Sequence, residues 1–322
     1  MVNPFKNILD TKTRVLILGY GKEGRSSFAT LRALYPKLIV GIADGDISLK
    51  DDTTLKNADN IQLHVGEKYL LALNDYDVII KSPGVKLPNL DKSIFRKVTS
   101  QTDLFLGVFS SQTIGVTGTK GKSTTASLIN HILQKCGKKS ILIGNIGVPA
   151  FEMLNNITSD TIVVYELSAH QLEYVHRSPH IAVLLNIFPE HLDYFDDEVG
   201  YQNAKHNIYK FQNSNDKLII GSQVKNDLKN INGELFCIDN SNIDLELAYP
   251  LLGNHNKLNS EIAISAVLDM GVNRNDAVAA LKSFTGLPHR LEVIGKHGGI
   301  TFINDSISTI PESTIAAMES MN

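Results

Sequence analysis

The ten residues GVTGTKGKST at positions 115–124 restrict the fold more than any other stretch of the sequence. The apolar run TIGV precedes this glycine-rich turn, and the turn leads into TTASLINHIL, which has the pattern of a helix. A strand, a glycine-rich turn and a helix in this order are typical of loops that bind phosphate. We therefore expect an α/β protein with a nucleotide site.

The residues of this loop suit a triphosphate with magnesium. Gly118 and Gly121 let backbone N–H groups converge on an anion, and Lys122 can bridge the terminal phosphates. Ser123 or Thr124 can offer a hydroxyl group to the metal ion. A capped turn that carries an incidental lysine is the alternative interpretation, and we favour triphosphate binding.

Length and composition limit the functions that are admissible. At 322 residues the chain is too long for one ordinary core, so we expect two domains. A net charge of -3 gives no global field for nucleic acid or an anionic membrane. The apolar runs RVLILGYG and IAVLLNIF are far shorter than a membrane span of about 20 residues, and the N-terminus lacks a signal-peptide core. We expect a cytoplasmic, monomeric protein. The two isolated cysteines, Cys136 and Cys237, are expected to serve packing in the interior.

A second glycine-rich turn lies near the start of the chain, in RVLILGYGKEGRSS. Gly19, Gly21 and Gly24 follow an apolar strand and open a helix, at the spacing that lets backbone amides approach a diphosphate. Asp44 follows the next strand, where a hydroxyl group of a nucleotide-sugar or dinucleotide is usually held. The alternative is a tight turn whose glycines serve packing alone. Short β-branched runs alternate with helical stretches throughout, which predicts parallel sheets covered by helices.

Carboxylates follow two further predicted strands. TIVVYE places Glu166 at the end of one strand, and IAVLLNIFPEHLDY places Glu190, His191 and Asp193 after another. Ligands gather at the carboxyl ends of the strands in open α/β sheets. We therefore expect a metal cluster here, with Glu166 as a ligand. The alternatives are solvated carboxylates and a histidine that is satisfied by the backbone.

Seven motifs occur in the order found in Mur ligases: GVTGTKGKSTT, GNIGVPAF, YELSAHQLE, LLNIFPEHLDYF, LLGNHNKLN, LPHRLEVI and INDSISTIPEST. The chain resembles this family over nearly its whole length, and its spacing is most similar to the branch that adds glutamate to UDP-N-acetylmuramoyl-L-alanine. The resemblance implies an α/β fold in three parts. A Rossmann-like domain for the UDP-sugar covers residues 1–110, and a central P-loop ATPase domain with a mostly parallel sheet covers 111–287. Residues 288–322 begin a third, Rossmann-like domain that binds glutamate.

The resemblance also implies roles at the ATP site. The residues that would hold the ATP phosphates are Gly118, Thr119, Gly121, Lys122, Ser123 and Thr124. Two magnesium ions would be bound by Ser123, Thr124, Glu166, His191 and Lys205. Lys205 matches a family lysine that is carbamylated and so becomes a carboxylate-like metal ligand. Catalytic roles would fall to Lys122, His191 and Lys205. Without the resemblance, Lys205 reads as an exposed helix lysine.

Further residues correspond to substrate contacts in this family. The residues implied at the UDP-sugar are Gly21, Gly24, Asp44, Ser82, Pro83, Gly84, Asn145 and Gln171. Near the adenine and phosphates of ATP the resemblance implies Asn256 and His255, at the start of a helix that runs to about Met270 and that could instead be core packing with a polar cap. Arg290 and Asp305 correspond to the linker and to the contact with the ATP ribose, and Arg290 would also reach the phosphates.

The reaction that the resemblance implies is amide formation. ATP converts the carboxylate of UDP-N-acetylmuramoyl-L-alanine to an acyl phosphate, which the amine of glutamate then attacks. Such a reaction requires no protein nucleophile, and its catalysis rests on positioning and charge neutralisation. A folylpolyglutamate-type or muramoyl-tripeptide ligase and a non-catalytic nucleotide-binding relative are the alternatives.

Several positions depart from the family pattern. Val116 stands where a P-loop has glycine, Ile307 stands where the family has lysine in DSKAT, and Lys120 stands where asparagine is common. The last two features resemble a variant branch that adds L-glutamate, so D-glutamate is favoured and L-glutamate stays open. The chain also has only about 35 residues after Leu287, too few to build the third domain. We expect either a truncated sequence or a protein that has lost ligation.

Overall fold

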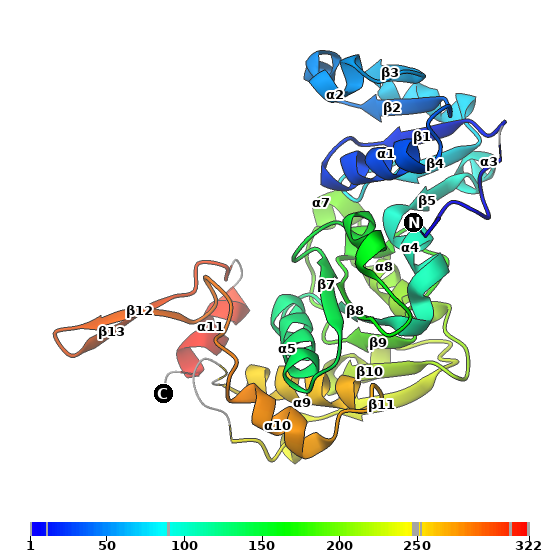
Figure 1. Ribbon diagram of the computed structural model, residues 1–322. Coiled ribbons are helices and arrows are strands. Elements are labelled where there is room, and N and C mark those ends of the chain that lie inside the picture. The colour runs from blue at the N-terminus through cyan, green and yellow to red at the C-terminus, as the bar shows by residue number, and fades with distance from the viewer. Residues whose placement is uncertain are drawn as a thin grey trace.

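The computed structural model describes residues 2–10, 12–88, 91–246, 251, 253–308 and 311–320. Figure 1 shows two α/β units joined end to end, with a β-hairpin that projects sideways beside the second unit. The first unit contains the N-terminal glycine-rich turn, and the second contains the loop at residues 118–124.

The first unit is built around a five-stranded parallel sheet in the order β3-β2-β1-β4-β5. Its strands are β1 (Val15–Leu18), β2 (Val40–Asp44), β3 (Ile61–Val65), β4 (Val78–Lys81) and β5 (Val98–Ser100). Its helical segments are α1 (Lys22–Leu34), η1 (Ile47–Asp51), α2 (Thr53–Lys56), η2 (Tyr69–Asp75), α3 (Lys92–Phe95), α4 (Gln101–Phe109) and η3 (Ser110–Gln112). Because β1 pairs with both β2 and β4, the turns after β1 and β4 lie side by side at a topological switch point.

The second unit contains a six-stranded parallel sheet in the order β11-β10-β9-β6-β8-β7. Its strands are β6 (Thr113–Thr117), β7 (Ser140–Gly144), β8 (Ile162–Glu166), β9 (Ile181–Leu184), β10 (Lys217–Gly221) and β11 (Glu234–Ile238). Its helical segments are α5 (Lys122–Lys135), η4 (Ala150–Asn156), α6 (Ala169–Leu172), α7 (Leu192–Phe195), α8 (Glu198–Lys210), η5 (Ser222–Asp227), η6 (Asn240–Asn242), α9 (Asn254–Leu268) and α10 (Arg274–Leu281). β6 pairs with both β8 and β9, so the loops after these three strands meet at one edge.

The strands of the second sheet are buried on both faces. Ile114 and Val116 of β6 pack in a cluster with α5, α9 and α10 on one face. Val163 and Tyr165 of β8 belong to the cluster on the other face, which also contains residues of α4 and α8. This burial on both faces explains why the strands read as continuous apolar runs in the sequence.

The hydrophobic core of the first unit is continuous with that of the second. One cluster contains Ile17 of the first sheet, Phe105 of α4 and Tyr165 of the second sheet. Phe5 in the N-terminal segment is fully buried in the same cluster, and its ring meets that of Phe151 edge to face at 5.4 Å. The N-terminal segment therefore helps to join the two units.

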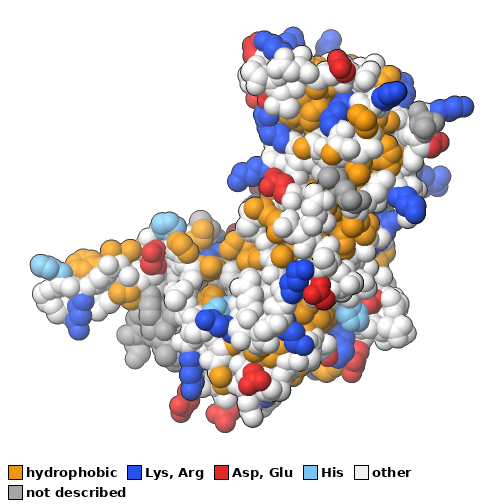
Figure 2. Space-filling view, in the orientation of Figure 1, with side chains coloured by type: hydrophobic (Ala, Val, Ile, Leu, Met, Phe, Trp, Pro, Cys, Tyr) orange, Lys and Arg blue, Asp and Glu red, His pale blue; other side chains and the backbone are white. Residues whose placement is uncertain are grey.

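The last described elements form an antiparallel hairpin and a helix. They are β12 (Glu292–His297), β13 (Ile300–Asn304) and α11 (Pro311–Glu319). Figure 2 shows hydrophobic side chains along the hairpin, of which Ile294 is 63%, Ile300 64% and Phe302 52% exposed. The hairpin thus contributes little to the two cores.

These observations confirm the predicted α/β fold with parallel sheets. The helix expected after Gly253 is α9, which ends at Leu268. Cys136 is partly buried against the core, as expected, but the expectation for Cys237 is wrong. Cys237 is exposed because β11 is the edge strand of its sheet. No helix in the described ranges is long and apolar enough to cross a membrane.

We predict that Phe5→Ala strongly destabilises the protein, because it empties a fully buried site between the two units. The loss should be about 3–5 kcal/mol, as for other buried phenylalanines, and should appear as a lower midpoint of urea unfolding. Phe302→Ala, at a site that is 52% exposed, is the matched control and should change stability by less than about 0.5 kcal/mol. Equal effects of the two variants would contradict the assigned role of Phe5.

Candidate active site

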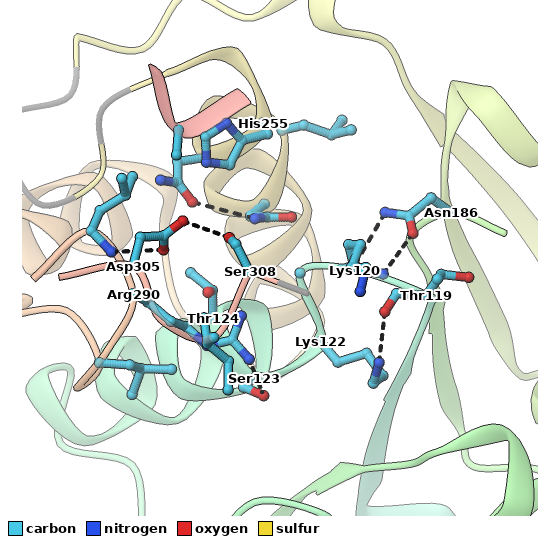
Figure 3. A pocket seen from close by; sticks show the side chains of 18 of the residues that line it. Thr119, Lys120, Lys122, Ser123, Thr124, Asn186, His255, Arg290, Asp305 and Ser308 are labelled. Atoms are coloured by element: carbon cyan, nitrogen blue, oxygen red, sulfur yellow. Dashed lines mark hydrogen bonds between the residues drawn. The ribbon is translucent and has the colours of Figure 1, made fainter. Parts of the chain in front are cut away.

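A cavity of about 570 Å³ lies at the carboxyl ends of β6 and β9. Its walls come from the loop after β6, the segment after β9, the start of α9, and the segments around Arg290 and Asp305. Figure 3 shows side chains from these separate segments turned toward one another. The structure therefore brings together the residues predicted for the ATP phosphates, apart from Gly118, with Asn256, Arg290 and Asp305.

Strand β6 ends at Thr117, and the phosphate loop begins at Gly118. Val116 is a fully buried residue of β6, so the missing glycine at this position falls inside the sheet and leaves the turn unaffected. Gly121 has a φ of +84°, and a Cβ atom there would lie 2.8 Å from Oδ1 of Asn259. Both the backbone conformation and the space require glycine at this position.

Asn186 holds the loop in place, although the sequence analysis did not single it out. Its Oδ1 atom accepts a hydrogen bond from the Lys120 backbone N–H at 2.8 Å, and its side-chain amide donates to the Lys120 carbonyl at 3.1 Å. The Asn186 carbonyl also accepts from the Thr119 N–H at 2.9 Å. The only sequence signal was an asparagine at the end of the apolar run IAVLLN.

Three cationic side chains line the cavity near the start of α5. The Lys122 ammonium group donates to the Thr119 carbonyl at 2.9 Å, and Arg290 donates to the Ser123 hydroxyl at 3.1 Å. Lys120 forms an ion pair with Glu190 at 2.9 Å. Burial lowers the pKa of Lys122, since its charged form loses hydration. These cations and the N-terminus of a 14-residue helix favour an anion in the cavity.

Glu166 lies at the end of β8 and is fully buried. Its Oε1 atom accepts a hydrogen bond from the Asn145 side chain at 2.9 Å, while Oε2 has no hydrogen-bond partner among the described residues. The charges of Lys122 and Arg290 act on this carboxylate. A buried carboxylate oxygen without a partner is costly, and a bound cation would satisfy it.

Lys205 is also buried, so its interpretation as an exposed helix lysine is wrong. It lies on α8 with 1% exposure, and its ammonium group donates to the Gly118 carbonyl at 2.9 Å. Burial, followed by the nearby charge of Lys122, lowers the pKa of Lys205 well below its usual value. The amine is thereby shifted toward its neutral form.

The expected cluster of carboxylates and histidine does not form. Among the described residues, no three His, Cys, Asp or Glu side chains lie close enough to hold a metal ion. Glu190 and His191 line the cavity, whereas Asp193 does not. Burial alone would raise the pKa of Glu190, but its hydrogen bond to Lys120 and the charge of that lysine outweigh burial and lower the pKa. Glu190 therefore pairs with the loop instead of joining a metal cluster.

The far wall of the cavity contains the residues predicted near the adenine and ribose. Asp305 accepts hydrogen bonds from the Leu291 N–H at 3.1 Å and from the Ser308 hydroxyl at 2.5 Å. Ile307, next to Ser308, contributes an apolar side chain to the wall. His255 lies at the start of α9, and burial lowers the pKa of its ring. Thr309 of the DSIST motif lies outside the described residues.

The glycines after β1 serve different purposes. A Cβ atom at Gly24 would lie 2.0 Å from the Gly19 carbonyl, so Gly24 is required for packing. Gly21 faces open space, as does Gly84 in the loop after β4. Ser82 in that loop donates to the Gly19 carbonyl at 2.7 Å. The two loops thus form one surface on which Gly21 and Gly84 leave the backbone accessible.

Asp44 and Gln171, both predicted to contact the UDP-sugar, have structural partners. The Asp44 carboxylate accepts from the Tyr20 N–H at 2.7 Å, which fixes the glycine-rich turn. Gln171 caps α6 together with Ser168 and donates to Glu23 of the first unit at 2.7 Å. The contact of Asp44 with Tyr20 spans 24 residues and that of Gln171 with Glu23 spans 148, so local sequence pattern could not predict them, whereas the cap of α6 is local.

Comparison with known proteins places the chain in a family. Residues 116–236 match the Mur ligase middle domain. A UDP-N-acetylmuramoylalanine--D-glutamate ligase from Clostridium kluyveri is 34% identical over 81% of this chain and 62% of its own length. A UDP-N-acetylmuramoyl-L-alanine--L-glutamate ligase from Xanthomonas axonopodis pv. citri is 31% identical over 94% of this chain and 71% of its own length. The chain belongs to the Mur ligase family.

A solved structure supports the same fold. The MurF ligase from Thermotoga maritima in complex with ADP has a TM-score of 0.57 and 19% sequence identity, over 97% of this chain and 73% of that chain. The chain described here spans about three fifths of the length of the Clostridium kluyveri relative.

We predict that Asn186→Ala weakens the binding of a non-hydrolysable ATP analogue by about tenfold. The variant leaves the Lys120 backbone without both of its side-chain partners, at a cost of about 1–3 kcal/mol, and tenfold corresponds to about 1.4 kcal/mol. Isothermal titration calorimetry measures the affinity. Asn74→Ala, at an exposed site of the first unit, is the control and should bind normally. Normal binding by Asn186→Ala would show that the loop keeps its shape without this clamp.

Proposed function

We propose that the chain carries the ATP site and the nucleotide-sugar site of a cytoplasmic amide ligase. The ligase adds glutamate to UDP-N-acetylmuramoyl-L-alanine during the synthesis of peptidoglycan precursors. Support comes from one observation above all. Arg290 donates to Ser123 of the phosphate loop in the cavity wall, and the charge of the buried Glu166 carboxylate acts on Arg290, so a triphosphate would find cationic partners close to a carboxylate that could hold a cation.

The residues of the cavity fit the charge of γ-phosphoryl transfer. Lys122, Arg290 and the start of α5 would hold the phosphates, with the backbone of the Gly118–Gly121 turn around them. The carboxylate of the lactoyl-alanine group attacks the γ-phosphorus atom, and the bond between this atom and the bridging oxygen breaks to release ADP. The product is an acyl phosphate, whose leaving group is much better than oxide.

The second half of the reaction needs orientation more than acid or base strength. The neutral amine of glutamate attacks the carbonyl carbon of the acyl phosphate to give a tetrahedral intermediate. This intermediate expels phosphate and loses a proton from nitrogen, which leaves an amide. Holding the reactants in line contributes about 7–11 kcal/mol to such reactions. The exclusion of water protects the acyl phosphate from hydrolysis.

The donor set suits magnesium. The unpartnered Oε2 atom of Glu166 and the hydroxyl groups of Ser123 and Thr124 are hard oxygen ligands of the kind that this ion prefers. Bound magnesium would neutralise charge that develops on the phosphates. We propose that Lys205 and His191 serve a second ion. The lowered pKa of Lys205 favours the neutral amine, which can form an N–C bond to carbon dioxide and release a proton to give a carbamate.

The acceptor amino acid is proposed to be D-glutamate, with L-glutamate as the second candidate. The relative from Clostridium kluyveri is named for D-glutamate, and the relative from Xanthomonas axonopodis pv. citri, of similar identity, is named for L-glutamate. Lys120 and Ile307, the two residues that resemble the L-glutamate branch, both lie in the cavity wall, so L-glutamate is included in the test.

Phosphate release by the full-length protein tests this proposal. We expect release from ATP that requires both UDP-N-acetylmuramoyl-L-alanine and glutamate, with the D and L enantiomers compared in parallel. A requirement for a folate or for a longer muramoyl peptide would identify a related ligase instead. Tight ATP binding without turnover under any of these conditions would show a non-catalytic protein.

We predict that Lys122→Ala abolishes phosphate release and leaves the affinity for the UDP-sugar near normal. Lys122 lines the cavity of the second unit, and the described lining of this cavity contains no residue of the loops after β1 and β4. Phosphate release and calorimetric binding of UDP-N-acetylmuramoyl-L-alanine measure the two effects. Lys135→Ala, at the other end of the same helix, is the control and should behave as the unmodified protein. Equal loss of both properties in Lys122→Ala would contradict the separate roles of the two sites.

A further inference from the structure

A buried lysine lies between the two units and takes no part in the steps described above. Lys81 ends β4 in the first unit and is 2% exposed. An ammonium group that is removed from water is stable only where partners compensate its charge. The positions of these partners show what the lysine does.

The side chains that contact the Lys81 ammonium group come from the second unit. Its Nζ atom lies 2.9 Å from the Tyr194 hydroxyl and 3.3 Å from Oε2 of Glu173. It also lies 4.9 Å from the ring centroid of Tyr174 and 5.6 Å from that of Tyr194. Burial lowers the pKa of Lys81, and the charge of Glu173 opposes this shift. A cation of the first unit is therefore enclosed by an anion and two aromatic rings of the second.

The same contacts hold the loop that follows β4. The carbonyl groups of Ser82 and Pro83 each accept from the Lys81 ammonium group at 3.4 Å. The Tyr194 hydroxyl lies 2.9 Å from the Val85 carbonyl. This loop faces the glycine-rich turn on one side and Tyr194 on the other, so its position relative to the second unit depends on this network.

Tyr194 extends the network toward the phosphate cavity. The ring of His170 lies 4.3 Å from that of Tyr194 and 4.9 Å from that of His191. Burial, followed by the charge of His191, lowers the pKa of His170 to about 4, so this ring stays neutral near pH 7. His191 lines the cavity and has a φ of +57°, a conformation that its surroundings must enforce. Packed groups thus run without a break from Lys81 to the cavity.

We propose that Lys81 is a positioning residue that fixes the loop at residues 82–85 against His191. It thereby sets the nucleotide-sugar site in register with the ATP site. This inference rests on the proposed function. Moving the loop at residues 82–85 would separate the buried Lys81 from Glu173, which is costly. The loop is therefore held firmly relative to the second unit. Reacting atoms must approach to about 3–3.5 Å, and an error of about 1 Å can cost about 100-fold in rate.

The test compares Lys81→Met with Lys86→Met. Lys86 is the matched control because it joins the same two segments, through Asp196 at 2.6 Å, but with a side chain that is 43% exposed. Exposed ion pairs of this kind contribute little. In Lys81→Met we expect a 10- to 100-fold lower kcat for phosphate release, with the KM for ATP within about twofold. Lys86→Met should change neither value by more than about twofold.

Hydrogen exchange provides a readout that does not depend on activity. Lys81→Met should speed the exchange of backbone amides both at 82–85 and at 191–194, whereas Lys86→Met should speed neither. If Lys81→Met folds poorly, Lys81→Met with Glu173→Gln removes the buried cation together with the charge of its half-buried partner and should give the same pattern. Faster exchange at 82–85 alone would overturn the inference. If the unmodified protein releases no phosphate, the proposed function fails, and the exchange pattern still decides whether Lys81 links the two segments.

Discussion

The architecture depends on charges that are held out of water at one edge of the second sheet. Glu166 is fully buried and Lys205 is 1% exposed, and burial lowers the pKa of both Lys122 and Lys205. Removing such groups from water costs several kcal/mol each, and only neighbouring charges or a bound ligand offset this cost. Lys120 is already paired with Glu190, whereas Lys122 and Arg290 also line the cavity and could hold the phosphates of a nucleotide. Phosphate bound there would offset part of the cost of burying these cations.

The strand order explains how these charges come together from distant parts of the sequence. β6 lies between β8 and β9, so the loop at residues 118–121, Glu166 and the segment from Asn186 to His191 share one edge. The shared core adds a second constraint, because the first unit is packed on the second through Phe105 and Tyr165. With the units joined in this way, the loops after β1 and β4 have a defined position relative to the phosphate cavity.

The sequence predicted the features that depend on local pattern. The loop at residues 118–124, the parallel strands and the position of Glu166 at a strand end follow from apolar runs and glycine spacing, and the structure places them as expected. Local sequence pattern could not predict contacts between residues that are far apart in the chain. The clamp by Asn186 spans 66 residues, and the contact between Lys81 and Tyr194 spans 113. The same limit applies to the expected cluster of Glu166, Glu190, His191 and Asp193, which does not form among the described residues, and Glu190 is paired with Lys120 from another loop.

Two residues of the cavity wall that depart from the family pattern, Lys120 and Ile307, come from different segments. Lys120 adds a cation beside the phosphate loop, but Glu190 pairs with it at 2.9 Å, so their net charge is zero and the field at the phosphates changes little. Ile307 lies in a different segment and contributes an apolar side chain to the wall. A substrate group that approaches this wall at Ile307 would therefore meet an apolar side chain, whereas a group at the phosphate loop would meet the ion pair of Lys120 and Glu190.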